Sequence, residues 1–127
     1  LRGWSGLAGD AQTWYELGIA SSHEQWGVAT ADATAYLGSV AAVSMETMAM
    51  EKWVALWLQG YESWTEWRRL DYPNDISAPA AAISGNGIPV RHGYGAQTIS
   101  NNKSNYDAAV ALQGPDTQDT KLWWDTK

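Results

Sequence analysis

Residues 44–70 carry the pattern that most restricts how this chain can fold, because they combine helical spacing with an unusual density of tryptophan. From Glu51 onward, large apolar side chains recur every three to four residues and cover about 200° of a helical wheel. This spacing predicts one long helix over residues 44–70, and so wide an arc indicates burial on more than one side. Gly60 lies inside that helix, so we expect a neighbouring backbone or ring to press against it.

A second helix is predicted over residues 10–26. Asp10 supplies an acceptor for the first free amides of the helix, and Gly27 stands where helices commonly end. Gly18 and Ser22 lie in the middle of the apolar arc of this helix. Small residues at that position indicate close contact with another helix.

Two shorter helices complete the expected all-α fold class. The first covers residues 32–37, where Thr30 or Asp32 can act as the cap. The second covers residues 102–112 and is stopped by Gly114-Pro115. The first of these rests on its possible caps and on Gly38 at its end, because its apolar pattern is weak, whereas the second also has an apolar face.

Residues 71–101 have a different character, because they hold most of the prolines and several glycines of the chain. This composition predicts a loop-rich region. Within it, Asn86-Gly87 is a tight-turn signal that is compatible with a short hairpin. The final stretch, residues 115–127, contains the pair Trp123-Trp124, which predicts a tail docked on the rest of the protein.

Charge and cysteine content exclude several classes of function. The chain has 127 residues and a net charge of −6, from 8 Lys and Arg against 14 Asp and Glu. An acidic chain does not favour sequence-independent nucleic-acid binding, which needs clustered cations. Cysteine is absent, which excludes disulfides, zinc–thiolate sites and cysteine nucleophiles within these residues. No apolar run approaches the roughly 18 residues that a membrane helix needs.

The aromatic residues are the first hint of function. The chain contains nine Trp and six Tyr but no Phe. Each large aromatic side chain can bury about 150–250 Å² of surface. A Trp-rich core or buried interface is the simpler interpretation. The alternative is that some Trp faces form a stacking surface for a sugar or another flat ligand.

Glu62 and Glu66 are the one carboxylate pair with a spacing that suits acid–base chemistry. They lie four residues apart on one helical face, and paired carboxylates catalyse glycoside hydrolysis. Both fall on the polar arc of the predicted long helix, among other charged residues. We therefore interpret them as part of a solvated helix face, and predict no catalytic residue in the chain.

Metal and cofactor sites receive no better support. His23 begins a sequence that resembles a zinc-binding helix but lacks the second histidine, and His92 is far away in the sequence. Asp71, Asn74 and Asp75 could line a site for a hard cation, but this composition is typical of turns. We predict no metal and no cofactor, so binding and structural roles outrank catalysis.

Residues 52–69, followed by Tyr72-Pro73, resemble the C-terminal region of the SusD/RagB-like nutrient-binding lipoproteins, particularly the second SusD-like subgroup. The family more often has Thr-Gly where Leu70-Asp71 stand here, and Tyr-Pro where Tyr94-Gly95 stand. Further segments match in the same order along the chain: 1–4, 9–12, 15–19, 24–28, 88–91, 102–106 and 119–125.

This resemblance implies a mainly helical fold with tetratricopeptide-like helix pairs, of which this chain is a C-terminal segment. It implies a non-catalytic protein on the cell surface of a Gram-negative bacterium, held in the outer membrane by an N-terminal lipidated cysteine that is absent from this chain. It further implies a lid on a SusC-type TonB-dependent transporter that captures glycans, or in some members peptides. The resemblance assigns no ligand-binding residue.

Two other interpretations stay open at this point. The segment could have a purely structural or partner-docking role, with the ligand contacts elsewhere in the protein. A glycoside hydrolase fragment is a third interpretation, and it rests on Glu62 and Glu66 alone.

Overall fold

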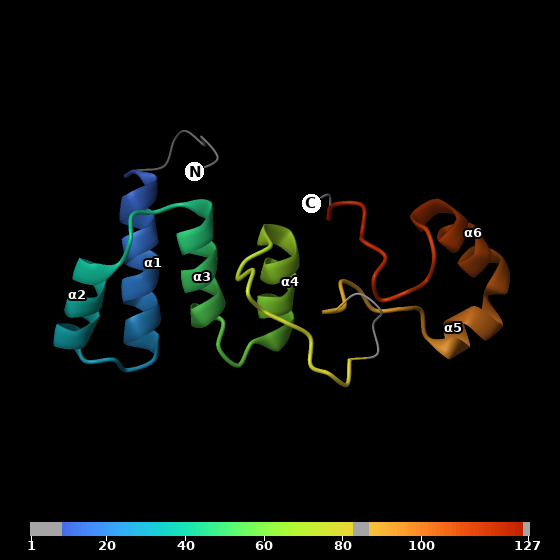
Figure 1. The fold of residues 1–127 in the computed structure, drawn as a ribbon, viewed down its shortest axis with the longest axis horizontal. Coiled ribbons are helices and arrows are strands. Elements are labelled where there is room, and N and C mark those ends of the chain that lie inside the picture. Colours follow the sequence, from blue (N-terminus) through green and yellow to red (C-terminus); the bar gives the residue numbers. More distant parts are fainter. Residues whose placement is uncertain (1–8, 83–86, 126–127) are drawn as a thin grey trace. The chain divides into compact units, whose positions relative to one another are not determined.

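The structure, a computed structural model, describes residues 9–82 and 87–125 and has the all-helical character that the sequence predicted (Figure 1). No β-strand occurs in the described residues. The proposed hairpin around Asn86-Gly87 falls largely on residues 83–86, outside the described part. The chain divides into two compact units, residues 1–74 and residues 75–127, and each is described by itself.

The first unit is a row of four helices. They are α1 (Ala11–Gln25), α2 (Thr30–Ser39), α3 (Met45–Ala55) and α4 (Gly60–Leu70). Helix α1 contacts both α2 and α3, and α3 also contacts α4. The chain reverses direction between successive helices (Figure 1). Side by side, the helices lie in the order α2, α1, α3, α4. This unit is therefore built from two antiparallel helix pairs.

Local capping chemistry explains where α1 and α3 begin. The Asp10 carboxylate accepts hydrogen bonds from Thr13 N at 2.8 Å and from Thr13 Oγ1 at 2.9 Å. These bonds lower the pKa of Asp10, the bond from the Thr13 backbone being the largest cause. At α3, the Ser44 hydroxyl accepts from Thr47 N while Thr47 Oγ1 accepts from Ser44 N, which forms a capping box. The predicted helix over residues 10–26 is thus confirmed almost to its ends.

The single long helix predicted over residues 44–70 is wrong, because a turn at residues 56–59 divides it into α3 and α4. Leu58 has a φ of 67°, a left-handed conformation that interrupts the helical path. The turn is closed by a 2.9 Å hydrogen bond from Gln59 N to Leu56 O and by a 3.1 Å bond from Ser63 Oγ to Leu56 O.

This division also corrects two expectations that followed from the long helix. Gly60 is the first residue of α4, and a Cβ atom there would meet nothing within 4 Å. The wide apolar arc belongs to two helices with different neighbours, so it does not describe one doubly buried helix. Several of its members are exposed in this chain: Val54 59%, Trp57 65%, Leu58 81% and Tyr61 77%.

Helix α2 is longer than the predicted 32–37 segment and starts without either expected cap. Its N-cap is Ala29, which makes no side-chain hydrogen bond, and Asp32 lies in the first turn. A carboxylate there interacts favourably with the positive end of the helix dipole. Alanine at residues 31, 33 and 35 favours helix strongly, so the helix extends beyond the segment that spacing indicated.

Asp71 ends α4 in the way that glycine usually ends a helix. It adopts a φ of 58° and a ψ of 27°, and its amide donates to Trp67 O at 2.8 Å. Aspartate tolerates the left-handed region better than most residues, because its short side chain is polar.

The second unit contains α5 (Ala96–Asn101) and α6 (Lys103–Gln113). Helix α6 confirms the prediction over residues 102–112, and Gly114 with a φ of 95° ends it before Pro115. Helix α5 is a correction, because residues 71–101 were predicted as loops. It has only six residues, so neither its length nor its apolar spacing gave a signal.

Replacing Asp71 should reveal the cost of its left-handed backbone. Asp71→Gly is expected to raise the free energy of unfolding by up to about 1 kcal/mol, because glycine adopts this conformation without steric strain. Asp71→Ala should lower it, because alanine tolerates this conformation less well than aspartate. Urea denaturation followed by helical circular dichroism measures both, and equal stabilities for the two variants would contradict the account.

Candidate functional site

The candidate site is an apolar groove of about 490 Å³ in the first unit, between α1 and α3. Trp14, Trp26 and Trp57 line it and are each about half exposed or more, at 50%, 47% and 65%. Helix α1 and the turn after it contribute Trp14, Tyr15, Gly18, Ile19, Ser22, His23, Trp26 and Val28, and α3 and its turn contribute Met48, Glu51, Lys52, Val54, Ala55 and Trp57.

A polar cluster joins three helices beside the groove. The Tyr36 hydroxyl on α2 donates a 2.6 Å hydrogen bond to Glu51 Oε1 on α3. The His23 ring on α1 lies edge-on to the Tyr36 ring, with 5.1 Å between the centroids. The bond to Glu51, together with burial and the charge of Glu51, raises the pKa of Tyr36 to about 12. Glu51 is therefore engaged in a hydrogen bond that links α3 to α2, on the other side of α1.

The second charged pair of the groove region ties α3 to α4. Lys52 Nζ lies 3.0 Å from Glu66 Oε2, and Arg69 Nε donates to Glu66 Oε1 at 3.2 Å. Burial raises the pKa of Glu66, but the hydrogen bonds and charges of Arg69 and Lys52 outweigh it, so the pKa is lowered overall. A carboxylate held ionised in this way is unsuited to donate a proton as a general acid.

The two carboxylates that suggested hydrolysis therefore have different surroundings. Glu66 is engaged by two cations and its side chain is only 15% exposed. Glu62 is exposed in the first turn of α4. Neither residue lines the groove.

Two buried polar atoms at the groove lack a hydrogen-bond partner among the described residues. They are the Tyr15 hydroxyl and His23 Nδ1. Tyr15 is only 8% exposed, and burial raises the pKa of its hydroxyl. Buried polar groups of this kind normally find a partner in the native protein. Both residues line the groove, but these two atoms are themselves shielded from solvent, so the surface that the groove offers is mainly apolar.

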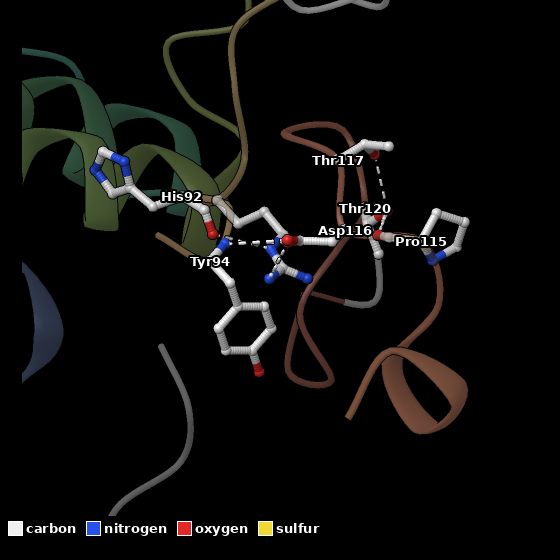
Figure 2. Close-up of polar contacts among 7 residues, drawn as sticks. His92, Tyr94, Pro115, Asp116, Thr117 and Thr120 are labelled. Atoms are coloured by element: carbon white, nitrogen blue, oxygen red, sulfur yellow. Dashed lines mark hydrogen bonds and ion pairs between the residues drawn. The ribbon is translucent and has the colours of Figure 1, made fainter. Parts of the chain in front are cut away.

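A different arrangement, a buried ion pair, organises the second unit (Figure 2). Arg91 Nη2 lies 3.1 Å from Asp116 Oδ1, and both side chains are below 10% exposed. Asp116 also accepts from Tyr94 N, and Arg91 Nε donates to His92 O at 3.1 Å. With its amide oxygen turned toward the guanidinium, Gln113 accepts from Arg91 Nη1 at 2.9 Å. The charges are thus matched and hydrogen-bonded, which marks the cluster as structural.

The same cluster joins the tail to the segment before α5. Val90 N donates to Gln118 O at 2.8 Å. Thr120 Oγ1 donates to Pro115 O at 2.6 Å and lies 2.9 Å from Thr117 Oγ1 (Figure 2). Farther along, Trp124 is half-buried but Trp123 is 89% exposed.

The residues considered for metal binding are not brought together within either unit. Asp71 is the C-cap of α4, and Asn74 and Asp75 are exposed in the segment that follows. His23 lies on α1, whereas His92 belongs to the second unit. In residues 9–82 and 87–125, no group of three or more His, Asp or Glu side chains is placed to hold a metal ion. The helices of these segments include none that is long and apolar enough to cross a membrane.

The groove itself was missed from the sequence. Spacing correctly indicated that Gly18 and Ser22 face the apolar side of α1, but not that this side remains open. The missing information was the turn at residues 56–59, which decides which face of α3 meets α1.

The helix pairs of the first unit and the sequence motifs of residues 52–73 can be compared with those of known protein families. Residues 1–95 match the SusD-like_2 family, described as "Starch-binding associating with outer membrane". The chain belongs to this family, and the resemblance drawn from its sequence motifs is confirmed. No curated protein matches the chain significantly.

Solved structures agree with this assignment. The chain is similar to a Bacteroidetes SusD-like protein named AC2a, with 28% identity, a TM-score of 0.83 and coverage of 95% of this chain and 27% of that one. It is also similar to a chitin-binding protein, with 26% identity, a TM-score of 0.82 and coverage of 94% of this chain and 29% of that one. A chitin-binding SusD homologue from Flavobacterium johnsoniae has 25% identity, a TM-score of 0.81 and coverage of 99% of this chain and 33% of that one. The chain therefore spans about a third of the length of the solved proteins that it matches.

Glu66 should make the stability of the first unit sensitive to acid. Its pKa in the folded protein lies below the ordinary value of 4.5, so the unfolded chain takes up the proton first. The stabilisation is therefore complete above about pH 4.5 and is lost as the pH falls through the lower, folded-state pKa. Glu66→Gln is expected to lower the free energy of unfolding by about 1 kcal/mol at neutral pH. It should also make that free energy fall less steeply as the pH is lowered into the acid range.

Urea denaturation at a series of pH values measures this effect. Glu62→Gln is the matched control, because Glu62 is exposed on the same helix. Stability profiles for Glu66→Gln and the unaltered chain that run parallel into acid would contradict the role of the pair.

Proposed function

We propose that this chain is part of a non-catalytic, cell-surface protein that binds glycans for uptake. The observation that carries the proposal is the family match over residues 1–95, whose description names starch binding and the outer membrane. Two of the similar solved structures are described as chitin-binding. Starch and chitin are both polysaccharides, so a glycan is better supported as the class of ligand than any particular glycan. A peptide ligand is the alternative.

The arrangement of the carboxylates supports binding without turnover. Glycoside hydrolysis uses two carboxyl groups that flank the bond to be broken, one of them able to donate a proton. Here Glu66 is kept ionised by Lys52 and Arg69, and Glu62 points to an exposed position on α4. The hydrolase interpretation therefore loses the feature on which it rested.

For the 127 residues themselves, we favour a scaffolding role within that protein. The charged residues of the groove, Glu51 and Lys52, are already engaged by Tyr36 and Glu66. A sugar site needs several polar groups with free hydrogen-bonding capacity beside its aromatic rings. The ligand contacts then lie mainly in other parts of the protein.

The proposal also includes the partner and location that membership of this family implies. The intact protein is expected to be lipid-anchored in the outer membrane and to act as a lid on a SusC-type TonB-dependent transporter. Opening and closing of such a lid would pass the captured ligand to the transporter. The family description supports the outer-membrane association.

Ligand binding by the full-length gene product tests the proposal. Isothermal titration calorimetry against oligosaccharides of starch and of chitin, with a peptide pool as the alternative ligand, is expected to show saturable binding. Chromatography of the same mixtures is expected to show no shortened product after long incubation. Shortened products would refute the non-catalytic role, and failure to bind any of the three ligand types would refute the binding function.

A further inference from the structure

The chain exposes more surface than its size accounts for. Its accessible surface is 9075 Å². Two separate compact proteins of the sizes of residues 1–74 and 75–127 would together expose about 8,000 Å². Part of the surplus is apolar, since Trp57, Leu58 and Tyr61 are each at least 65% exposed. Large apolar side chains exposed together at residues 57–61 indicate a face that another structure covers.

The middle of the groove is shaped for the backbone of a helix. Gly18 lies near the centre of α1 and lines the groove, yet a Cβ atom there would meet nothing within 4 Å. Glycine inside a helix costs stability relative to alanine, and α1 gains no close contact in return. Small residues on a helix face allow a second helix to approach closely. The empty space over Gly18 is thus a gap of the kind that a crossing helix fills.

The polar atoms around the groove argue against a sugar as its occupant. Glu51 and Lys52, the two charged residues that line the groove, are already shared with Tyr36 of α2 and Glu66 of α4. The rest of the lining is mainly apolar, which suits the apolar face of a helix better than a sugar rich in hydroxyl groups.

We propose that the groove between α1 and α3 is an internal docking surface of the full-length protein. Its occupant is an amphipathic α-helix from the remainder of the same polypeptide, whose backbone passes over Gly18. The length of the related structures supports this occupant, because the chain spans only 27–33% of each while matching nearly all of its own length. Rows of antiparallel helix pairs bury their open faces by stacking on further helices.

Two glycine variants of the full-length gene product test the proposal. Gly18→Leu should lower its melting temperature by about 3 °C or more, because the added side chain collides with the docked helix. Gly38→Leu is the matched control, since Gly38 also lies inside a helix with nothing within 4 Å but does not line the groove.

Gly18→Ala keeps the test decisive if the larger variant does not fold. It should lower the melting temperature of the full-length protein, whereas Gly38→Ala should leave it unchanged or raise it, because alanine favours a helix over glycine where no neighbour intervenes. Equal melting temperatures for the Gly18 and Gly38 variants of the full-length protein would overturn the proposal. So would a gene product of only 127 residues.

Two further results would assign the groove to another occupant and overturn the proposal. Loss of oligosaccharide binding by Gly18→Leu at unchanged stability would place a glycan there. Conversion of a dimer to a monomer by Gly18→Leu, measured by analytical ultracentrifugation, would place a second copy there. Failure of the full-length protein to bind any glycan or peptide would refute the proposed function and leave the docking proposal standing.

Discussion

The reversal of the chain at residues 56–59 is the constraint on which the first unit depends. It converts one tryptophan-rich segment into α3 and α4 and lays them side by side. Lys52 and Glu66 meet across this pair, which they could not do on one continuous helix 14 positions apart. The reversal also decides which face of α3 is left for α1.

Once that face is set, α1 takes a central position between α2 and α3. Its Tyr15 and Ile19 are the buried apolar residues of α1, and Ala49 of α3 and Leu70 of α4 are the others among the described residues. None of the described tryptophans of the first unit is buried to this extent. This arrangement explains how a chain with nine Trp can leave several of them exposed: the rings belong to surfaces at which further structure is expected to pack. This geometry supports the scaffolding role that we propose.

The parts of the fold that were predictable from the sequence are those decided by local chemistry. Asp10 caps α1 and Gly114-Pro115 ends α6, because both signals act within one helical turn. The turn at Leu58 carried no such signal, since leucine rarely adopts a left-handed backbone and no proline marks the break. Helix α5 was too short to show a period.

The candidate site was less predictable for a physical reason. The motifs of residues 52–69 indicated the family, and the family indicated a class of ligand. The groove requires α1 and α3 to lie side by side, which depends on packing between residues more than 30 positions apart. The spacing placed Gly18 on the apolar side of α1, but the close helix contact predicted there is absent from this structure, in which a Cβ atom at Gly18 would meet nothing within 4 Å.

Oxidative footprinting of the full-length gene product and of the 127-residue chain tests the central claim most directly, namely that the open face of α1 and α3 is an internal packing surface. Peptide mass spectrometry would compare the reactivity of Trp14 and Trp57, which are 50% and 65% exposed in this chain. The account predicts strong protection of both rings in the full-length protein without any ligand. Rings as reactive there as in the 127-residue chain would contradict it.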